Sequence, residues 1–397
     1  MNGLRFFTYC ADAWTLLSSS FETMFMWLGG SGYTSNHIPV FGSRPTDYQQ
    51  EGNSQFLQSF AGLFLDERII DQVFFDYDLI QTGDILVARR FTGLTAQQML
   101  FSGSYASHVA LVVRDEYGQQ FVIECREDWT TDKKTGVMKT TLDDWVVGAY
   151  QAGYEAAWLP LRRKSLNDVE KHLGDLNAWF DTVEGNSYSP VKDFLASFDH
   201  STQGLPAPFN SESMPMYMRT ANKMERYLGM RPFWNEFKEA IGFRFQEKIK
   251  DRRISKSQLP DSLDETLQFA SIDLNMSLQD LLAIPEKDEW RYDTQNGREA
   301  FTPASFVAQA LQKLRILTRL DINASEFTVK DIYELNIFET RFEKPESCLE
   351  ADHRLPFCQM FGKFRLHLPS YNSLSPYDHM NETCPNKFEN SWRPAGC

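Results

Sequence analysis

Basic residues are in short supply in this sequence. Its 40 lysines and arginines are outnumbered by 54 aspartates and glutamates, which gives a formal net charge of -14. A protein that binds nucleic acid needs basic side chains to replace the phosphate counterions, so we expect no nucleic-acid partner. The same acidity disfavours binding to an anionic membrane surface through charge alone.

Long apolar runs are also missing. Segment 1–33 is rich in apolar and aromatic residues, but Asp12, Glu22 and several serines and threonines interrupt it. It therefore has no span long enough to cross a bilayer, and no charged region that leads into a clean apolar core as in a signal peptide. We interpret it as a helical segment that covers an apolar surface or a partner. An atypical targeting segment is the alternative. Membrane association without a transmembrane helix stays open.

Cysteine is scarce, and four of the six cysteines lie in the last fifty residues. None of these has the CxxC spacing of a zinc site, so we expect no metal, and we expect no cofactor. A loop-rich tail with four cysteines is typical of two disulfides, and three glycosylation sequons also favour an oxidising compartment. We expect the secretory pathway, either outside the cell or in an organelle lumen, with the cytosol as the alternative. The residues concerned are Cys348, Cys358, Cys384 and Cys397 in the tail, and Asn275, Asn323 and Asn381 in the sequons.

The composition, with 42% hydrophobic and 14% aromatic residues, is typical of a globular protein with a large core. No internal repeat is visible. Composition and turn residues predict an apolar N-terminal segment, a linker, a main domain that contains a mostly helical insert, and a loop-rich tail. These correspond to residues 1–33, 34–66, 67–340 with the insert at 190–285, and 341–397.

Three β-rich runs with turn residues between them lie at residues 85–90, 107–113 and 121–126. They predict adjacent strands of a small antiparallel sheet packed on helices, and hence an α+β fold. His108 opens the second run and Glu124 lies near the end of the third, so a short turn brings both to the same end of the sheet. A histidine with a carboxylate partner is the base and orienting group of a catalytic triad.

The order of these parts resembles the permuted papain-like proteins of the NlpC/P60 superfamily, which include the YiiX-like and lecithin:retinol-acyltransferase-like proteins. The matching motifs are Gly83-Asp84-Ile85-Leu86, Ser107-His108-Val109-Ala110 and Val122-Ile123-Glu124. Later motifs, such as Trp158-Leu159-Pro160-Leu161, are similar to a eukaryotic secreted branch. The resemblance implies a papain-like core in which His108 and Glu124 take the places of the catalytic His and its polar partner.

The resemblance also implies a nucleophilic cysteine at the start of a late helix, and this sequence departs from it there. Thr302 as N-cap and Pro303 at the first helical position predict that helix start. The cysteine position aligns with Pro303 or Thr302, depending on the side from which residues are counted. Ser305 is the other candidate nucleophile, and Cys125 is expected on the opposite sheet face from Glu124, as a buried apolar residue.

We therefore expect a catalytically inactive papain-like protein that acts as a structural or binding subunit of a larger assembly. The alternative is an active hydrolase, amidase or acyl transferase with Ser305 or Thr302 as nucleophile and His108 as base. A third interpretation needs no cleft: the helical insert 190–285 binds a protein partner. Protein contacts are expected through the segment from Met1 to Ser54 or through the insert.

Overall fold

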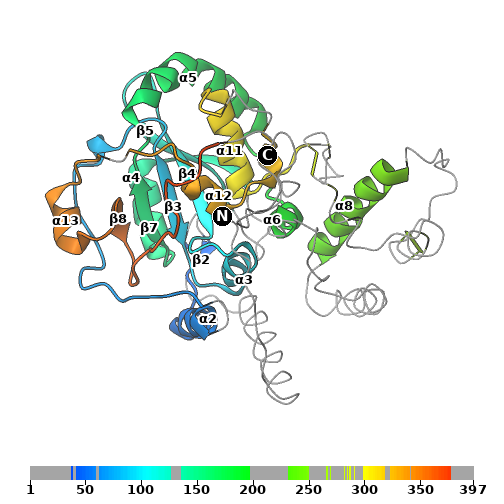
Figure 1. Ribbon diagram of the computed structural model, residues 1–397, viewed down its shortest axis with the longest axis horizontal. Coiled ribbons are helices and arrows are strands. Elements are labelled where there is room, and N and C mark those ends of the chain that lie inside the picture. The colour runs from blue at the N-terminus through cyan, green and yellow to red at the C-terminus, as the bar shows by residue number, and fades with distance from the viewer. Residues whose placement is uncertain are drawn as a thin grey trace, which may run out of the picture.

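The computed structural model describes residues 37–38, 42–59, 62–126, 136–196, 231–249, 298–317, 322–339 and 341–376, together with a few residues between 265 and 290. The fold is α+β, as expected (Figure 1). Its centre is a six-stranded antiparallel sheet with the strand order β6-β5-β4-β3-β7-β8. These strands are β3 (Ile85–Arg89), β4 (His108–Arg114), β5 (Gln120–Arg126), β6 (Gly136–Thr141), β7 (Glu155–Leu159) and β8 (Cys358–Phe361).

The three strands predicted from the sequence, β3, β4 and β5, are adjacent in the sheet, and this prediction is confirmed. The tight turn between β4 and β5 depends on Asp115, whose carboxylate accepts hydrogen bonds from the backbone N–H groups of Tyr117 at 2.9 Å and Gln119 at 2.8 Å. Gly118 supplies the positive φ of 82° that the turn needs. The turn fixes the register in which Leu111 lies opposite Ile123.

Helices cover one face of this sheet with an extensive apolar core. The covering helices are α5 (Arg163–Val183), α11 (Pro303–Lys313) and α12 (Val329–Glu334), whose apolar side chains meet alternate residues of the strands, such as Val109 and Leu111. The predicted start of α11 is confirmed, with Thr302 as N-cap and Pro303 at the first position. We call this side the α11 face.

The opposite face is covered by helix α4 (Leu142–Gln151) and, beside it, by segment 73–80, which contains the one-turn helix η1 (Tyr77–Leu79). Trp145 of α4 and Val73 of the segment belong to the same apolar cluster as Leu86 and Ala110 of the strands. We call this side the α4 face. Because side chains alternate along a strand, each strand contributes to both cores.

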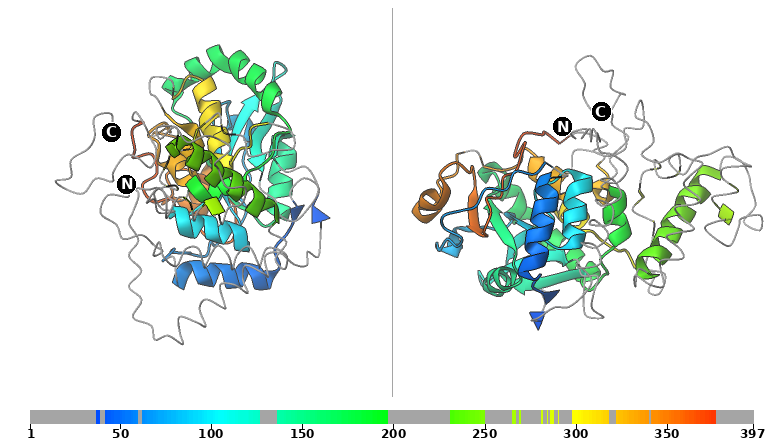
Figure 2. Two further views of the ribbon diagram at one scale, coloured as in Figure 1. Left: turned by 90° about the vertical axis from the view of Figure 1, so that its right-hand side faces the viewer. Right: turned by 90° about the horizontal axis from the view of Figure 1, so that it is seen from below.

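The sequence did not reveal several elements. Helix α2 (Asp47–Ser59) begins inside the expected linker 34–66, because Thr46 and Gln49 form a reciprocal capping pair at its start. The Thr46 N–H donates to Gln49 Oε1 at 2.9 Å, and the Gln49 N–H donates to Thr46 Oγ1 at 3.2 Å. It packs beside α3 (Gly93–Ser102) (Figure 2). Strand β6 was not predicted from the sequence either.

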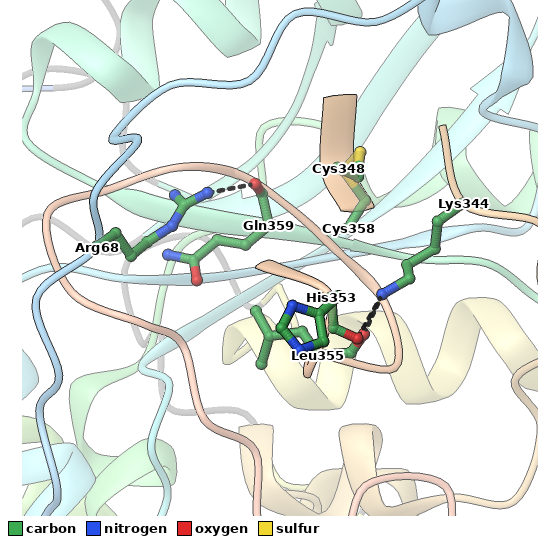
Figure 3. Close-up of a disulfide and its surroundings, with 7 residues drawn as sticks. All are labelled: Arg68, Lys344, Cys348, His353, Leu355, Cys358 and Gln359. Atoms are coloured by element: carbon green, nitrogen blue, oxygen red, sulfur yellow. Dashed lines mark hydrogen bonds between the residues drawn. A yellow bond between two sulfur atoms is a disulfide. The ribbon is translucent and has the colours of Figure 1, made fainter. Parts of the chain in front are cut away.

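The tail differs most from expectation. Residues 341–397 were expected to be loop-rich, but β8 from this region is the sixth strand of the central sheet and pairs with β7. Helix α13 (Glu346–Asp352) precedes β8, and the Cys348–Cys358 disulfide joins the two (Figure 3). Lys344 and Arg68 donate hydrogen bonds to backbone carbonyls around this bridge, including that of Gln359 at 3.0 Å from Arg68. Residues Cys358–Phe361 of this region are therefore part of the core sheet.

The disulfide is expected to stabilise the fold measurably. It closes a loop across a sequence separation of 10, and loop-closure entropy for a ring of that size gives about 2–3 kcal/mol. We expect the Cys348→Ser, Cys358→Ser double variant to lose that free energy of unfolding in urea denaturation monitored by tryptophan fluorescence. Dithiothreitol should lower the stability of the wild type by at least the same amount. Equal stability of the oxidised wild type and the double variant would contradict the expectation.

Part of the expected helical insert is described. Helix α6 (Pro190–Ala196) and helix α8 (Arg231–Ile249) are helical as expected, and α8 lies to one side of the sheet domain (Figures 1 and 2). The short strands β1 (His37–Ile38) and β2 (Gly42–Ser43) form a separate pair. No helix among the described residues is both long enough and apolar enough to span a membrane. The predictions for segment 1–33, Asn275, Asn381, Cys384 and Cys397 lie outside the described residues.

Candidate functional site

The structure brings His108 and Glu124 together. Continuing the β4–β5 register places them diagonally across two strands on one sheet face, and His108 Nε2 lies 2.6 Å from Glu124 Oε2. Both side chains are buried, with exposed fractions of 2% for His108 and 1% for Glu124. Cross-strand geometry explains the contact, since diagonal neighbours are within reach of long side chains.

Two further donors saturate the Glu124 carboxylate. Trp145 Nε1, from α4, lies 3.1 Å from each carboxylate oxygen, and the Arg126 guanidinium forms a buried ion pair with Oε1. Burial alone would raise the pKa of Glu124, but Arg126 and His108 outweigh it and lower this pKa to about 2. Glu124 is therefore an anion at any neutral or mildly acidic pH. Arg126 and Trp145 were not identified from the sequence, although Arg126 shares the period-2 face of Glu124.

The second ring nitrogen of His108 has no such partner. Nδ1 is buried, and no described residue forms a hydrogen bond with it. Because Nε2 faces a carboxylate, the tautomer with its proton on Nε2 is favoured, and Nδ1 then carries a lone pair. The ring of Tyr154 lies beside the imidazole, with the two ring centroids 6.1 Å apart. A base at this position would have to act through Nδ1.

Helix α11, where the nucleophile was expected, packs on the other face of the sheet. His108 is paired in register with Ala88, which belongs to the core of the α4 face. Val109, its neighbour in β4, instead packs in the same core as Phe306 and Val307 of α11. The sheet therefore separates the imidazole from the apolar face of α11.

The hydroxyl groups at the start of α11 are engaged in a capping box. Thr302 Oγ1 accepts the backbone N–H of Ser305 at 2.9 Å, and Ser305 Oγ accepts that of Thr302 at 2.8 Å. Ser305 also donates to the Thr302 carbonyl at 3.2 Å, and all of these atoms are buried. Pro303 occupies the first helical position and carries no nucleophilic group. The side chains of Thr302 and Ser305 thus cap the N-terminus of α11 and do not contact His108.

Cys125 lies on the α11 face, in the same core as Phe301, and is buried. Its Sγ lies 3.4 Å from the carbonyl oxygen of Phe301, to which it donates a weak hydrogen bond. Period-2 alternation, which directs Cys125 and Glu124 to opposite faces, anticipated this placement. The thiol therefore points away from the His108–Glu124 pair.

Asp84, from the Gly83-Asp84-Ile85-Leu86 motif, lies just before β3 and accepts three hydrogen bonds. It accepts from the N–H groups of Gln81 at 2.9 Å and Leu161 at 2.8 Å, and from Trp158 Nε1 at 2.7 Å. Burial raises its pKa to about 7 in spite of these donors. Asp84 therefore ties the entry of β3 to the end of β7, which is a structural role.

The remaining candidate residues lie elsewhere. Asn323 caps the one-turn helix η4 (Ala324–Glu326), and its Nδ2 donates to the carbonyl of Glu286 at 2.6 Å. The same nitrogen lies 3.4 Å from Glu326 Oε1, and a glycan would leave it a single N–H, enough for only one of these two bonds. Among the described residues, no cluster of histidine, cysteine or acidic side chains has the arrangement of a metal site.

Comparisons with known proteins give no relative. The chain matches no family model, and neither the curated proteins nor the solved structures contain a significant match. The molecule is therefore defined by its own features: an α+β fold with a disulfide-linked edge strand and a buried His108–Glu124–Arg126 network on one face of its central sheet.

Proposed function

We propose that this protein is a catalytically inactive member of the permuted papain-like class and acts as a structural or binding subunit, most simply in the secretory pathway. The observation that carries the proposal is the separation of the two halves of the expected site. The His108–Glu124 pair lies on the α4 face, whereas Thr302, Pro303 and Ser305 begin a helix on the α11 face.

Hydrolysis by a hydroxyl group requires a base in hydrogen-bond contact with the nucleophile. Neither Thr302 nor Ser305 has such a contact with His108, and each hydroxyl already serves the capping box. A helix dipole lowers the pKa of a thiol enough to ionise it, but a hydroxyl group starts from a far higher pKa. The alternative of a serine or threonine hydrolase therefore has less support than the inactive scaffold.

We expect no turnover of amide, thioester or lipid ester substrates above the rate in buffer, and no labelling by a fluorophosphonate. The assay should compare the wild type with His108→Ala, Ser305→Ala and Thr302→Val. His172→Ala is the matched control, because His172 lies on α5 and forms only a half-exposed pair with Asp175 at 3.0 Å. Activity that disappears in His108→Ala and persists in His172→Ala would refute the proposal. Additional loss in Ser305→Ala or Thr302→Val would identify the nucleophile of the alternative.

The binding role has its own support. The Cys348–Cys358 disulfide is compatible with an oxidising compartment. Helix α8 extends to one side of the sheet domain, as expected for an insert that contacts a partner (Figure 2). Cross-linking followed by mass spectrometry should place partner contacts on the insert, on the N-terminal segment, or on a further surface of the sheet domain.

A further inference from the structure

The outer surface of the α4 face combines exposed apolar side chains with acidic ones. Helix α4 and segment 73–80 cover this face side by side, and their inward side chains share one core. Two contacts fix how they lie. Tyr150 lies in the last turn of α4, and its ring centroid is 5.8 Å from that of Phe361. Phe361 in turn forms a β-bridge with Gln72, the residue next to Val73 at the start of the segment. At the other end, Asp143 of α4 is close enough to Tyr77 to help raise its pKa, after the larger effect of burial.

Several outward side chains of these two elements are apolar. In α4, Asp143, Val147 and Tyr150 follow each other at intervals of four and three residues and so share one helix face. Val147 is 55% exposed, and Phe74 of the neighbouring segment is 72% exposed. Burying such side chains against a partner favours binding, because it removes apolar surface from water. We define the α4 patch as Phe74, Val147, Tyr150 and the acidic residues Asp76, Asp78, Asp143 and Asp144.

Acidic residues border the α4 patch at the end where α4 begins, and we call them the acidic rim. Asp143 and Asp144 lie in the first turn of α4, and Asp76 and Asp78 border η1. The basic residue beside them is Arg114. Its guanidinium donates hydrogen bonds to the backbone carbonyls of Asp78 at 2.8 Å and Ile80 at 2.9 Å. No carboxylate of this rim is ion-paired to a described residue within the structure. Exposed apolar side chains bordered at one end by charges of a single sign are a combination typical of a binding surface.

We propose that the α4 patch docks a basic, amphipathic segment of another protein, whose apolar side chains cover Phe74, Val147 and Tyr150 and whose lysines or arginines face the acidic rim. Charge complementarity selects this occupant: an acidic segment would be repelled, and the protein's net charge of -14 strengthens the same preference. An anionic membrane is disfavoured for the same reason. The inference deepens the proposed binding role and rests on it, but it does not depend on whether the protein has lost catalysis.

The test uses the full chain and a synthetic 18-residue amphipathic peptide of lysine, leucine and one tryptophan, with a second peptide in which glutamate replaces lysine. Fluorescence anisotropy of the labelled peptides measures Kd. We expect the lysine peptide to bind, more weakly as salt rises from about 50 to 300 mM because the charge interaction is screened. The glutamate peptide should not bind.

Two pairs of variants locate the site. Phe74→Ser with Val147→Ser should weaken binding of the lysine peptide about tenfold, the scale of losing central apolar contacts. Its control is Phe64→Ser with Tyr48→Ser, which removes two side chains that are 65% and 86% exposed near helix α2, away from α4 and segment 73–80. Asp76→Asn, Asp78→Asn and Asp143→Asn together should weaken binding about three- to tenfold and flatten its salt dependence. Their control removes the same charge from the outer side of α5, by Asp168→Asn, Glu170→Gln and Asp181→Asn.

The outcomes separate cleanly. Loss of binding confined to the patch variants supports the proposal. Equal loss in patch and control variants, no binding of the lysine peptide, or equal binding of the glutamate peptide overturns it. Patch-dependent binding to zwitterionic phosphatidylcholine vesicles in preference to the peptide would also overturn it, in favour of a lipid surface. Turnover that depends on His108 would contradict only the inactive-enzyme proposal, and missing peptide binding would contradict only the docking proposal.

Discussion

Replacing Glu124 with leucine is expected to cost about 3–5 kcal/mol of unfolding free energy, because the change removes the shared partner of three buried donors. His108, Arg126 and Trp145 all contact this carboxylate, and His108 and Arg126 are 2% and 3% exposed. Without it, the Arg126 charge is buried with its main counter-ion gone. Urea denaturation monitored by tryptophan fluorescence measures the loss.

The pH dependence of this loss gives a second readout. Glu124 has a folded-state pKa of about 2 against an ordinary value of 4.5, so its charge stabilises the folded state at pH values above 4.5. That stabilisation, on the order of 3 kcal/mol, is lost as the pH falls from about 5 towards 2. In Glu124→Gln the charge is absent at every pH. The stability difference between wild type and Glu124→Gln should therefore shrink as the pH falls through this window.

Two controls make the result specific. Glu170→Gln removes an exposed carboxylate from α5, and its effect should stay within about 0.5 kcal/mol at every pH. His108→Ala should also be destabilising, because it removes one donor from the same network. A Glu124→Leu variant as stable as the wild type would mean that the network contributes little to stability, and would reopen the question of a catalytic role for the pair.

This network shows how far sequence reasoning reached. The strands β3, β4 and β5, their order and the meeting of His108 with Glu124 all follow from local patterns: β-rich runs, a tight turn and period-2 alternation. Arg126 could have been added by the same alternation. Trp145 could not, because its contact depends on how α4 crosses the sheet, and that angle is set by packing between residues distant in sequence.

The sequence could not predict which face of the sheet α11 packs on, for a similar reason. The start of the helix was predicted correctly, because Thr302 and Pro303 carry a local capping signal. Which sheet face it packs on is decided by the match of its apolar residues to Val109 and Leu111 on one side rather than to Ala88 and Ala110 on the other. Small side chains on the α4 face leave room for Trp145 and Trp158 instead.

The sequence did not predict the edge strand β8, because tertiary contacts rather than local propensity make this segment a strand. The run from Cys358 to Phe361 is only four residues long and lies among turn residues, so local propensity does not identify it. Strand β8 pairs with β7, is linked to α13 by the disulfide, and forms a β-bridge from Phe361 to Gln72. None of these contacts is local in sequence, apart from the disulfide.

Gly362, the residue that follows β8, offers the sharpest test of that edge. We expect Gly362→Ala to cost about 3–5 kcal/mol, because two penalties add. Its φ of 127° lies in a region that side chains rarely adopt, and a Cβ would lie 2.4 Å from Cβ of Glu155. Glu155 has no freedom to retreat, since its carboxylate pairs with buried Arg89 and accepts the N–H of Phe364 at 2.7 Å.

Gly118→Ala is the matched control for this change. Gly118 also has a positive φ, of 82°, but a Cβ there would meet nothing within 4 Å, so only the backbone strain of about 1–2 kcal/mol applies. The difference between the two variants therefore measures the close approach of β8 to Glu155. If both lost the same stability, the tail would not pack against β7 as tightly as these contacts require. If Gly362→Ala lost far more, and hydrogen exchange in β7 rose with it, the C-terminal region would act as a structural strand of the sheet.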